Sequence, residues 1–200
     1  MYRVFGDMLS GNCYKIKLLM QFLDIPHEWI HIDILAQETH TAEFKKMNPN
    51  TRIPVIELDN GDYLWESNAI LNYLAEGTKF LPDNGYHKAQ VLQWQFFEQY
   101  SHEPYIATAR YINKYLGLPK ERKAEYHGKQ AGGHKALKIM DYHLANQQFF
   151  VGNSVTIADI SLYAYTHVAE EGGFDLSSYT NIHRWFQDFE ATPNFIKMKR

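Results

Sequence analysis

Residues 48–76 read NPNTRIPVIELDNGDYLWESNAILNYLAE, and this stretch decides the class of fold. It contains two strand-like segments, 54–58 and 62–65, which are joined across Asn60-Gly61. Asn-Gly between apolar runs is the strongest short-range signal for a β-hairpin, because both turn residues are expected to adopt positive φ. The stretch therefore predicts two adjacent antiparallel strands.

A helix is expected to follow the hairpin at once. Ser67 has the position of an N-cap, and apolar residues at helical spacing continue to about Glu76. Upstream, the hydrophobic periodicity predicts a strand at 2–6, a helix from about 12 to 23, a strand at 28–34 and a short helix at 40–47. A strand, helix and strand of this length form a βαβ unit with parallel strands. The predicted order is therefore β-α-β-α-β-β-α, a mixed sheet with helices.

The chain beyond a linker at 77–85 is predicted to be helical throughout. Apolar stripes at helical spacing recur to the C-terminus, and no strand signal of comparable strength interrupts them. Pro104 is expected to bend the first long helix. We predict a mixed α/β domain at 1–77 and an all-helical bundle at 86–200.

The composition excludes several classes of protein. Hydrophobic residues make up 45% of the 200 residues and charged residues 22%, which excludes a disordered chain. The net charge of −3 argues against a dedicated nucleic-acid or anionic-membrane binder, since such proteins carry excess positive charge. No apolar run approaches the roughly 20 residues that span a bilayer, and residues 1–15 do not resemble a secretory signal. The single cysteine, Cys13, cannot form an internal disulfide, which favours a reducing cytoplasm.

The first candidate for chemistry is the loop-to-helix junction at Ser10. A helix N-terminus presents unpaired N–H groups and a partial positive charge, which stabilise an anion and depress the pKa of a thiol. The Ser10 hydroxyl is placed to donate a hydrogen bond to a bound thiolate. Cys13 is an alternative nucleophile, although the helix turns it toward the buried face. A capping role for Ser10 and a core role for Cys13 explain the same local pattern.

Two further candidates lie in the opening stretch. A cis Ile53-Pro54 bond would turn polar backbone groups toward a ligand, which could pair with this edge as an added strand. An ordinary trans proline that starts a strand explains the same residues. At Glu66-Ser67 a carboxylate, a hydroxyl and free N–H groups converge, a set that suits the charged ends of an amino acid. An N-cap with an acidic neighbour is the structural alternative.

Other motifs are interpreted as structural or absent. Thr156 and Asp159 form a capping box at a buried helix start. The ten histidines lack the spacing of metal ligands, since His27 and His31 flank a strand pattern and the others are scattered. No phosphate-binding glycine loop, serine-hydrolase elbow or dinucleotide fingerprint occurs in the sequence.

Taken jointly, several segments resemble the cytosolic glutathione S-transferases, in particular bacterial members of serine type. The segments are SGNCYKIKLL (10–19), NPNTRIPVIE (48–57), the Asp59-Asn60-Gly61 hairpin, WESNAILNYLAE (65–76) and VGNSVTIADISL (151–162). The resemblance covers nearly the whole chain. It implies a thioredoxin-like N-terminal domain, an all-helical C-terminal domain and a cytoplasmic homodimer.

The resemblance also implies roles for individual residues at a glutathione site. Ser10 matches the hydroxyl that holds the glutathione thiolate, and Pro54 matches the family's cis-proline. The remaining matches are Ile53 for the cysteinyl backbone, Glu66 and Ser67 for the γ-glutamyl end, and Arg52 with His40 for the glycyl carboxylate. Thr156 and Asp159 match a capping box linked to folding.

The implied activity is conjugation of the glutathione thiolate to small hydrophobic electrophiles. Glutathione would be a co-substrate, and no metal is expected. Tyr105, Arg110 and Tyr111, which follow Pro104, are our candidates for the electrophile pocket, with interhelix packing as the alternative. Two other functions stay open: a glutathione-dependent disulfide or peroxide reductase that uses Cys13, and a non-catalytic glutathione-binding scaffold.

Overall fold

The computed structural model describes residues 1–198, and these divide into two compact units. The first unit comprises Met1–Gly77 together with the segment that begins at Pro193, and the second comprises Thr78–Thr192. The sequence interpretation placed the C-terminal segment in the helical domain. In the structure the Tyr14 hydroxyl donates a hydrogen bond to the Ile196 carbonyl oxygen at 2.6 Å, which ties this segment to the N-terminal unit.

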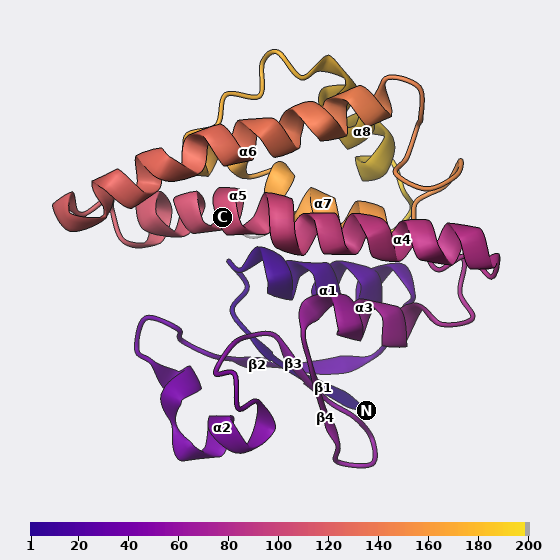
Figure 1. Ribbon diagram of the computed structural model, residues 1–200. Coiled ribbons are helices and arrows are strands. Elements are labelled where there is room, and N and C mark those ends of the chain that lie inside the picture. Colours follow the sequence, from indigo (N-terminus) through magenta and orange to yellow (C-terminus); the bar gives the residue numbers. More distant parts are fainter. Residues whose placement is uncertain (199–200) are drawn as a thin grey trace. The chain divides into compact units, whose positions relative to one another are not determined.

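The first unit is built on one four-stranded sheet (Figure 1). Its strands are β1 (Tyr2–Gly6), β2 (His27–His31), β3 (Val55–Glu57) and β4 (Tyr63–Trp65), arranged in the order β2-β1-β3-β4. β1 pairs parallel with β2, whereas β3 pairs antiparallel with both β1 and β4. The predicted βαβ unit and hairpin are both present.

Helices cover both faces of this sheet because its central strands carry apolar residues in alternation. Phe5 and Val55 are paired across β1 and β3 and pack with Phe44 of α2 (Ala42–Met47). Val4 and Ile56 are also paired and are fully buried. They point to the opposite face, where α1 (Gly11–Phe22) and α3 (Ser67–Ala75) pack against each other (Figure 1).

The hairpin turn differs from the predicted two-residue form. Glu57 pairs with Tyr63. The Leu58 N–H donates to the Asp62 carbonyl oxygen, and the Leu58 carbonyl oxygen accepts from the Gly61 N–H, so three residues form the loop. Gly61 has φ of 86°, whereas Asn60 is not among the residues with positive φ. A three-residue loop that ends in a left-handed glycine is the next most common hairpin connection.

Two of the element boundaries that differ from the sequence-based expectation are explained by neighbouring residues. β2 ends at His31 rather than at 34, because the Asp33 carboxylate accepts hydrogen bonds from the next backbone N–H groups, Leu35 at 2.8 Å and Ala36 at 3.0 Å, and turns the chain. Ser67 is the first residue of α3 rather than its N-cap. Glu66 occupies the cap with φ of 68° and makes no capping hydrogen bond through its side chain.

The second unit consists of helices. They are α4 (Gly85–Phe97), α5 (Glu103–Arg110), α6 (Lys123–Leu144), α7 (Ile157–Thr166) and α8 (Thr180–Glu190), with wider π-helical turns at Glu98–His102 and Tyr111–Tyr115. The first of these turns ends two residues before Pro104, which has no N–H to donate to a preceding turn. α7 is buried along its whole length and forms the centre of this unit.

The capping box at the start of α7 is present and connects three parts of the helical unit. Asp159 Oδ2 accepts hydrogen bonds from the Thr156 backbone N–H at 2.9 Å and from the Thr156 hydroxyl at 3.0 Å. Asp159 Oδ1 accepts from the Phe150 N–H at 3.0 Å and from the Trp185 indole N–H at 3.1 Å. The buried carboxylate therefore joins the loop before α7 to α8, and its pKa is raised by burial to about 6.

Candidate functional site

The loop between β1 and α1 places Ser10 at the N-cap of α1. Asp7 shapes this loop, since its carboxylate accepts from the Leu9 N–H at 2.9 Å and its carbonyl accepts from the Ser10 N–H at 3.1 Å. Ser10 Oγ accepts a long hydrogen bond of 3.4 Å from the Cys13 N–H. A hydroxyl that accepts in this way can still donate its own proton, which in the free protein is directed to the Cys13 sulfur. Ser10 is half-buried, and its hydroxyl lies at the positive end of the α1 helix dipole.

Cys13 lies one turn further into α1 and is fully buried. Burial raises the pKa of its thiol to about 12, and the opposing hydrogen bonds from Ser10 and Asp7 do not compensate. Its sulfur packs so closely on β1 that a Cβ at Gly6 would lie 2.6 Å from Sγ. Cys13 is therefore a protonated core residue near neutral pH, without the exposure and thiolate character of a nucleophile.

Cys13→Ala is expected to retain more than about half of the wild-type kcat/KM in a glutathione-dependent assay. The thiol is too buried to react, so its loss removes only packing, at about 1 kcal/mol of stability. Steady-state kinetics together with thermal unfolding test this expectation. A variant that stays folded and loses nearly all activity would establish Cys13 as the reactive group.

The second part of the site is the loop before β3. The Ile53-Pro54 peptide bond is cis, as the resemblance implied. The buried Asn48 holds the preceding turn: its amide donates to the Arg52 carbonyl at 2.8 Å, and its amide oxygen accepts from the Asn50 N–H at 2.9 Å. The Arg52 side chain is exposed beside this turn.

The third part is the start of α3. Glu66 is exposed and its carboxylate accepts from the Asn50 amide at 3.4 Å, which links it to the loop before β3. Ser67 is buried; its hydroxyl donates to Asn12 Oδ1 at 3.2 Å and accepts from Lys15 Nζ at 3.3 Å. The structure thus brings the starts of α1 and α3 together with the cis-proline loop.

Sequence reasoning missed the supporting residues Asn12, Lys15, Asn48 and Asn50. The three-residue spacing of Asn12 and Lys15 puts both on one face of α1, which is the available signal. That spacing does not reveal which residue of α3 they meet. His40, a weaker candidate for the glycyl end, is exposed, and its ring nitrogen lies 3.2 Å from the hydroxyl of the adjacent Thr39.

The candidates for the electrophile pocket lie on and after α5 in the helical unit. Arg110 is only 2% exposed, and its Nε donates to Glu171 Oε2 at 2.6 Å. Tyr105 packs closely against α6, since a Cβ at Gly132 would lie 2.2 Å from its ring. The ring of Tyr111 lies 5.5 Å from that of Tyr115. The Arg110 guanidinium is thus bound within the helical unit, while both tyrosines are half-buried.

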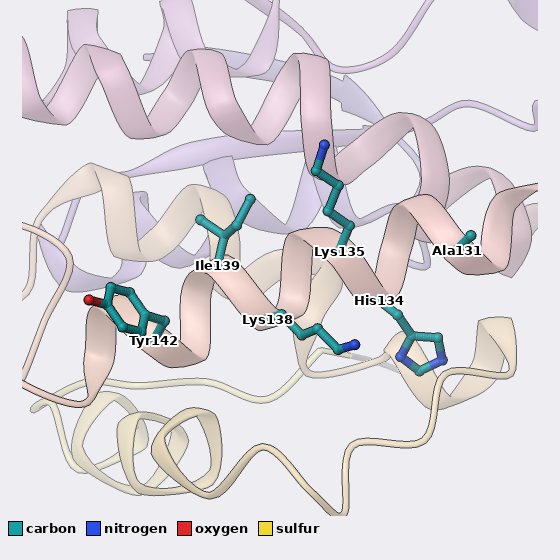
Figure 2. A pocket seen from close by; sticks show the side chains of 6 residues that line it. All are labelled: Ala131, His134, Lys135, Lys138, Ile139 and Tyr142. Carbon is teal, nitrogen blue, oxygen red and sulfur yellow. The ribbon is translucent and has the colours of Figure 1, made fainter.

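Two hollows occur away from the sequence-predicted residues. One, of about 570 Å³, lies on the exposed side of α6 and is lined by Ala131, His134, Lys135, Lys138, Ile139 and Tyr142. Figure 2 shows that Lys135 and Ile139 point to a different side of this helix from Lys138, so the hollow is an open surface. The other, of about 130 Å³, lies in the N-terminal unit and is lined by Met8, Tyr14, Lys17, Trp29, Ile196, Lys197 and Met198.

The features of a metal centre and of a membrane-spanning helix are absent from residues 1–198. Within this part of the chain, no group of three or more His, Cys, Asp or Glu side chains is placed to hold a metal ion. No helix there combines the length and the apolar character that crossing a membrane requires.

Comparisons with known proteins agree with the geometry. Residues 9–76 match the model of the glutathione S-transferase N-terminal domain, and residues 94–193 match that of the C-terminal domain. A solved glutathione S-transferase from Pseudomonas fluorescens Pf-5 is 55% identical over 100% of this chain and 99% of its own, with a TM-score of 0.97. Glutathione S-transferase hmp2 of Hypomyces subiculosus is 26% identical over 98% of this chain and 96% of its own.

A more distant structure carries a ligand. The glutathione transferase from Burkholderia graminis is 23% identical, covers 96% of this chain and 85% of its own, and has a TM-score of 0.83. That protein was solved with two glutathione molecules per subunit. With both domain models matched in order and the 55% identical structure aligned over the full length, the chain belongs to the glutathione S-transferase family and is a transferase of that family.

Proposed function

We propose that the protein binds glutathione on its N-terminal unit and conjugates the glutathione thiolate to small hydrophobic electrophiles. The observation that carries this proposal is the convergence of Ser10, the loop that leads to Ile53-Pro54, and Glu66-Ser67 at the starts of neighbouring elements. Glutathione offers a thiol, an extended peptide backbone and an amino-acid end. The thiol suits the Ser10 hydroxyl, the peptide backbone suits the loop at Ile53-Pro54, and the amino-acid end suits Glu66-Ser67.

Each part of the site has a distinct role in the proposal. Glu66 accepts from the α-ammonium of the γ-glutamyl residue, and Ser67 at the N-terminus of α3 binds its α-carboxylate. The Ile53 backbone pairs with the cysteinyl residue as an added strand. Arg52, with His40 as a weaker candidate, attracts the glycyl carboxylate.

Ser10 supplies the chemistry at the sulfur. Its hydroxyl proton donates to the thiolate, and the N-terminus of α1 adds a favourable dipole. Both interactions favour the charged form and lower the pKa of the bound thiol, so that more thiolate is present near pH 7. Each unit of lowering corresponds to about 1.4 kcal/mol of selective thiolate stabilisation. The thiolate then attacks the electrophilic carbon, and the leaving group departs with its electron pair.

The electrophile is expected to contact the half-buried Tyr105 and Tyr111. Arg110 is the third candidate for the electrophile pocket. Its ion pair with Glu171 supports a role in positioning α5 rather than in direct contact with the electrophile. We also propose a cytoplasmic homodimer. The exposed Leu92, Phe96 and Tyr100 recur at four-residue spacing along α4 and the turn after it, and such an apolar stripe is typical of an interface.

A direct experiment combines binding and turnover. The purified protein is expected to bind a glutathione resin, to elute with free glutathione, and to conjugate chlorodinitrobenzene in a glutathione-dependent reaction. Activity with a disulfide or peroxide but with no aryl halide would instead indicate a reductase. Binding without turnover over a broad electrophile panel would indicate a scaffold, and failure to bind glutathione would refute the proposal.

A further inference from the structure

Ser67 is held by two side chains of α1 that the proposed reaction does not use. Its hydroxyl oxygen accepts from Lys15 Nζ at 3.3 Å, and its proton is donated to Asn12 Oδ1 at 3.2 Å. Both partners come from the first turns of the helix that Ser10 caps. The residue proposed for the γ-glutamyl end is therefore oriented by the same helix that serves the thiol.

Lys15 is unusual because its side chain is fully buried. Lysine is almost never fully buried unless its charge is paired or hydrogen-bonded, since desolvation of an ammonium is costly. Lys17, two residues along the same helix, is only half-buried, and its Nζ lies 3.3 Å from His27 Nε2 and 5.6 Å from the Trp29 ring centre. Both lysines belong to α1 and have the same charge, but they lie on different faces of the helix.

The hydrogen bonds of Ser67 determine whether its hydroxyl can donate to an anionic ligand. Lys15 donates to Ser67 Oγ, so the hydroxyl has one proton left to give. In the free protein Asn12 accepts that proton. A carboxylate is a charged and therefore stronger acceptor than an amide oxygen. Donation by an ammonium to the same hydroxyl polarises it and strengthens its own donation.

We infer that Lys15 is a positioning residue for the α-carboxylate of the γ-glutamyl group, acting through Ser67 and through its buried positive charge. The inference rests on the proposed glutathione function. It predicts that selectivity for a ligand with this carboxylate depends on Lys15, although the Lys15 side chain is not exposed. Ser10 and the reacting sulfur do not take part in this selectivity.

The test compares glutathione with γ-aminobutyryl-cysteinylglycine, which lacks only the α-carboxylate. For each variant the ratio of the two kcat/KM values is measured with one electrophile. Lys15→Met is expected to lower this ratio about tenfold, mainly through a higher KM for glutathione, which corresponds to about 1.4 kcal/mol. Lys15→Arg retains most of the preference because it keeps a buried cation, and Lys17→Met is the matched control with an unchanged ratio.

The ratio of the two kcat/KM values does not depend on the fraction of the protein that is correctly folded. Partial misfolding of a variant therefore does not lower this ratio. Ser67→Ala provides a second route: it is expected to lower the ratio as well, and Lys15→Met added to it is expected to lower the ratio little further. An unchanged ratio in Lys15→Met, or an equal fall for both thiols, would overturn the inference while leaving the glutathione function intact. A wild-type protein that neither binds nor uses glutathione would overturn the proposed function itself.

Discussion

Ser10→Ala is expected to lower kcat for glutathione conjugation by about a hundredfold, the size of effect seen when one donor to a developing or bound anion is removed. The substitution deletes the hydroxyl whose proton the proposed mechanism gives to the glutathione thiolate, and with it the acceptor of the Cys13 N–H. The bound thiol then loses its donor and its pKa rises toward that of free glutathione. Binding of glutathione should change little, because the other contacts remain. Steady-state kinetics and calorimetric binding measure the two effects separately.

Ser10→Thr is the control for this variant, since it keeps both the hydroxyl and the cap. Loss of the cap in Ser10→Ala is also expected to lower the stability by about 1 kcal/mol. Thermal unfolding should therefore accompany the kinetics, and activity is compared well below the unfolding transition. An unchanged kcat in Ser10→Ala would rule out the serine mechanism.

Asp159→Ala is expected to lower the free energy of unfolding by about 3–5 kcal/mol, which is large for a single substitution. Four hydrogen bonds end on this buried carboxylate, from Thr156, Phe150 and Trp185. Its removal leaves buried donors without an acceptor, and each such donor carries a desolvation penalty. Denaturant unfolding measures the loss, and a change below about 1 kcal/mol would contradict the structural role of this residue.

The same carboxyl gives a pH dependence with a defined sign. Burial raises its pKa from 3.8 to about 6 in the folded protein, so the folded state binds more protons than the unfolded state between these values. Its contribution to stability is therefore fully present below the unfolded value and is lost as the pH rises through about 6. Asp159→Asn is expected to remove this part of the profile. Equal pH profiles for the two proteins would contradict the raised pKa.

The sequence predicted the order of elements well because the decisive signals are local. Asn60-Gly61 indicated the hairpin, and the Thr156 and Asp159 spacing indicated the start of α7. The turn geometry was less predictable, because Asn60 does not adopt the positive φ that a two-residue turn requires. The end of β2 depended on the Asp33 carboxylate, whose capture of the following N–H groups overrides the apolar alternation.

Those residues of the candidate site that belong to a local motif, such as a helix N-cap, could be predicted from the sequence. Ser10 at a helix start is such a case, and its cap is present. Lys15 and Asn12 were not predictable, because their role depends on how α1 packs against α3. The attachment of the C-terminal segment to Tyr14 is likewise a contact between residues far apart in the chain, with no local pattern.

In the proposed mechanism, Ser10 stabilises the thiolate of glutathione bound to the N-terminal unit. The most direct measurement is a pH titration of the ultraviolet thiolate absorbance of glutathione bound to the wild-type protein and to Ser10→Ala. We expect the bound thiol to titrate at least about one pH unit below free glutathione in the wild-type protein, a difference of about 1.4 kcal/mol. In Ser10→Ala it should titrate close to the free value. A bound thiol that titrates like free glutathione in the wild-type protein, or one whose low pKa survives in Ser10→Ala, would contradict the proposed role of Ser10.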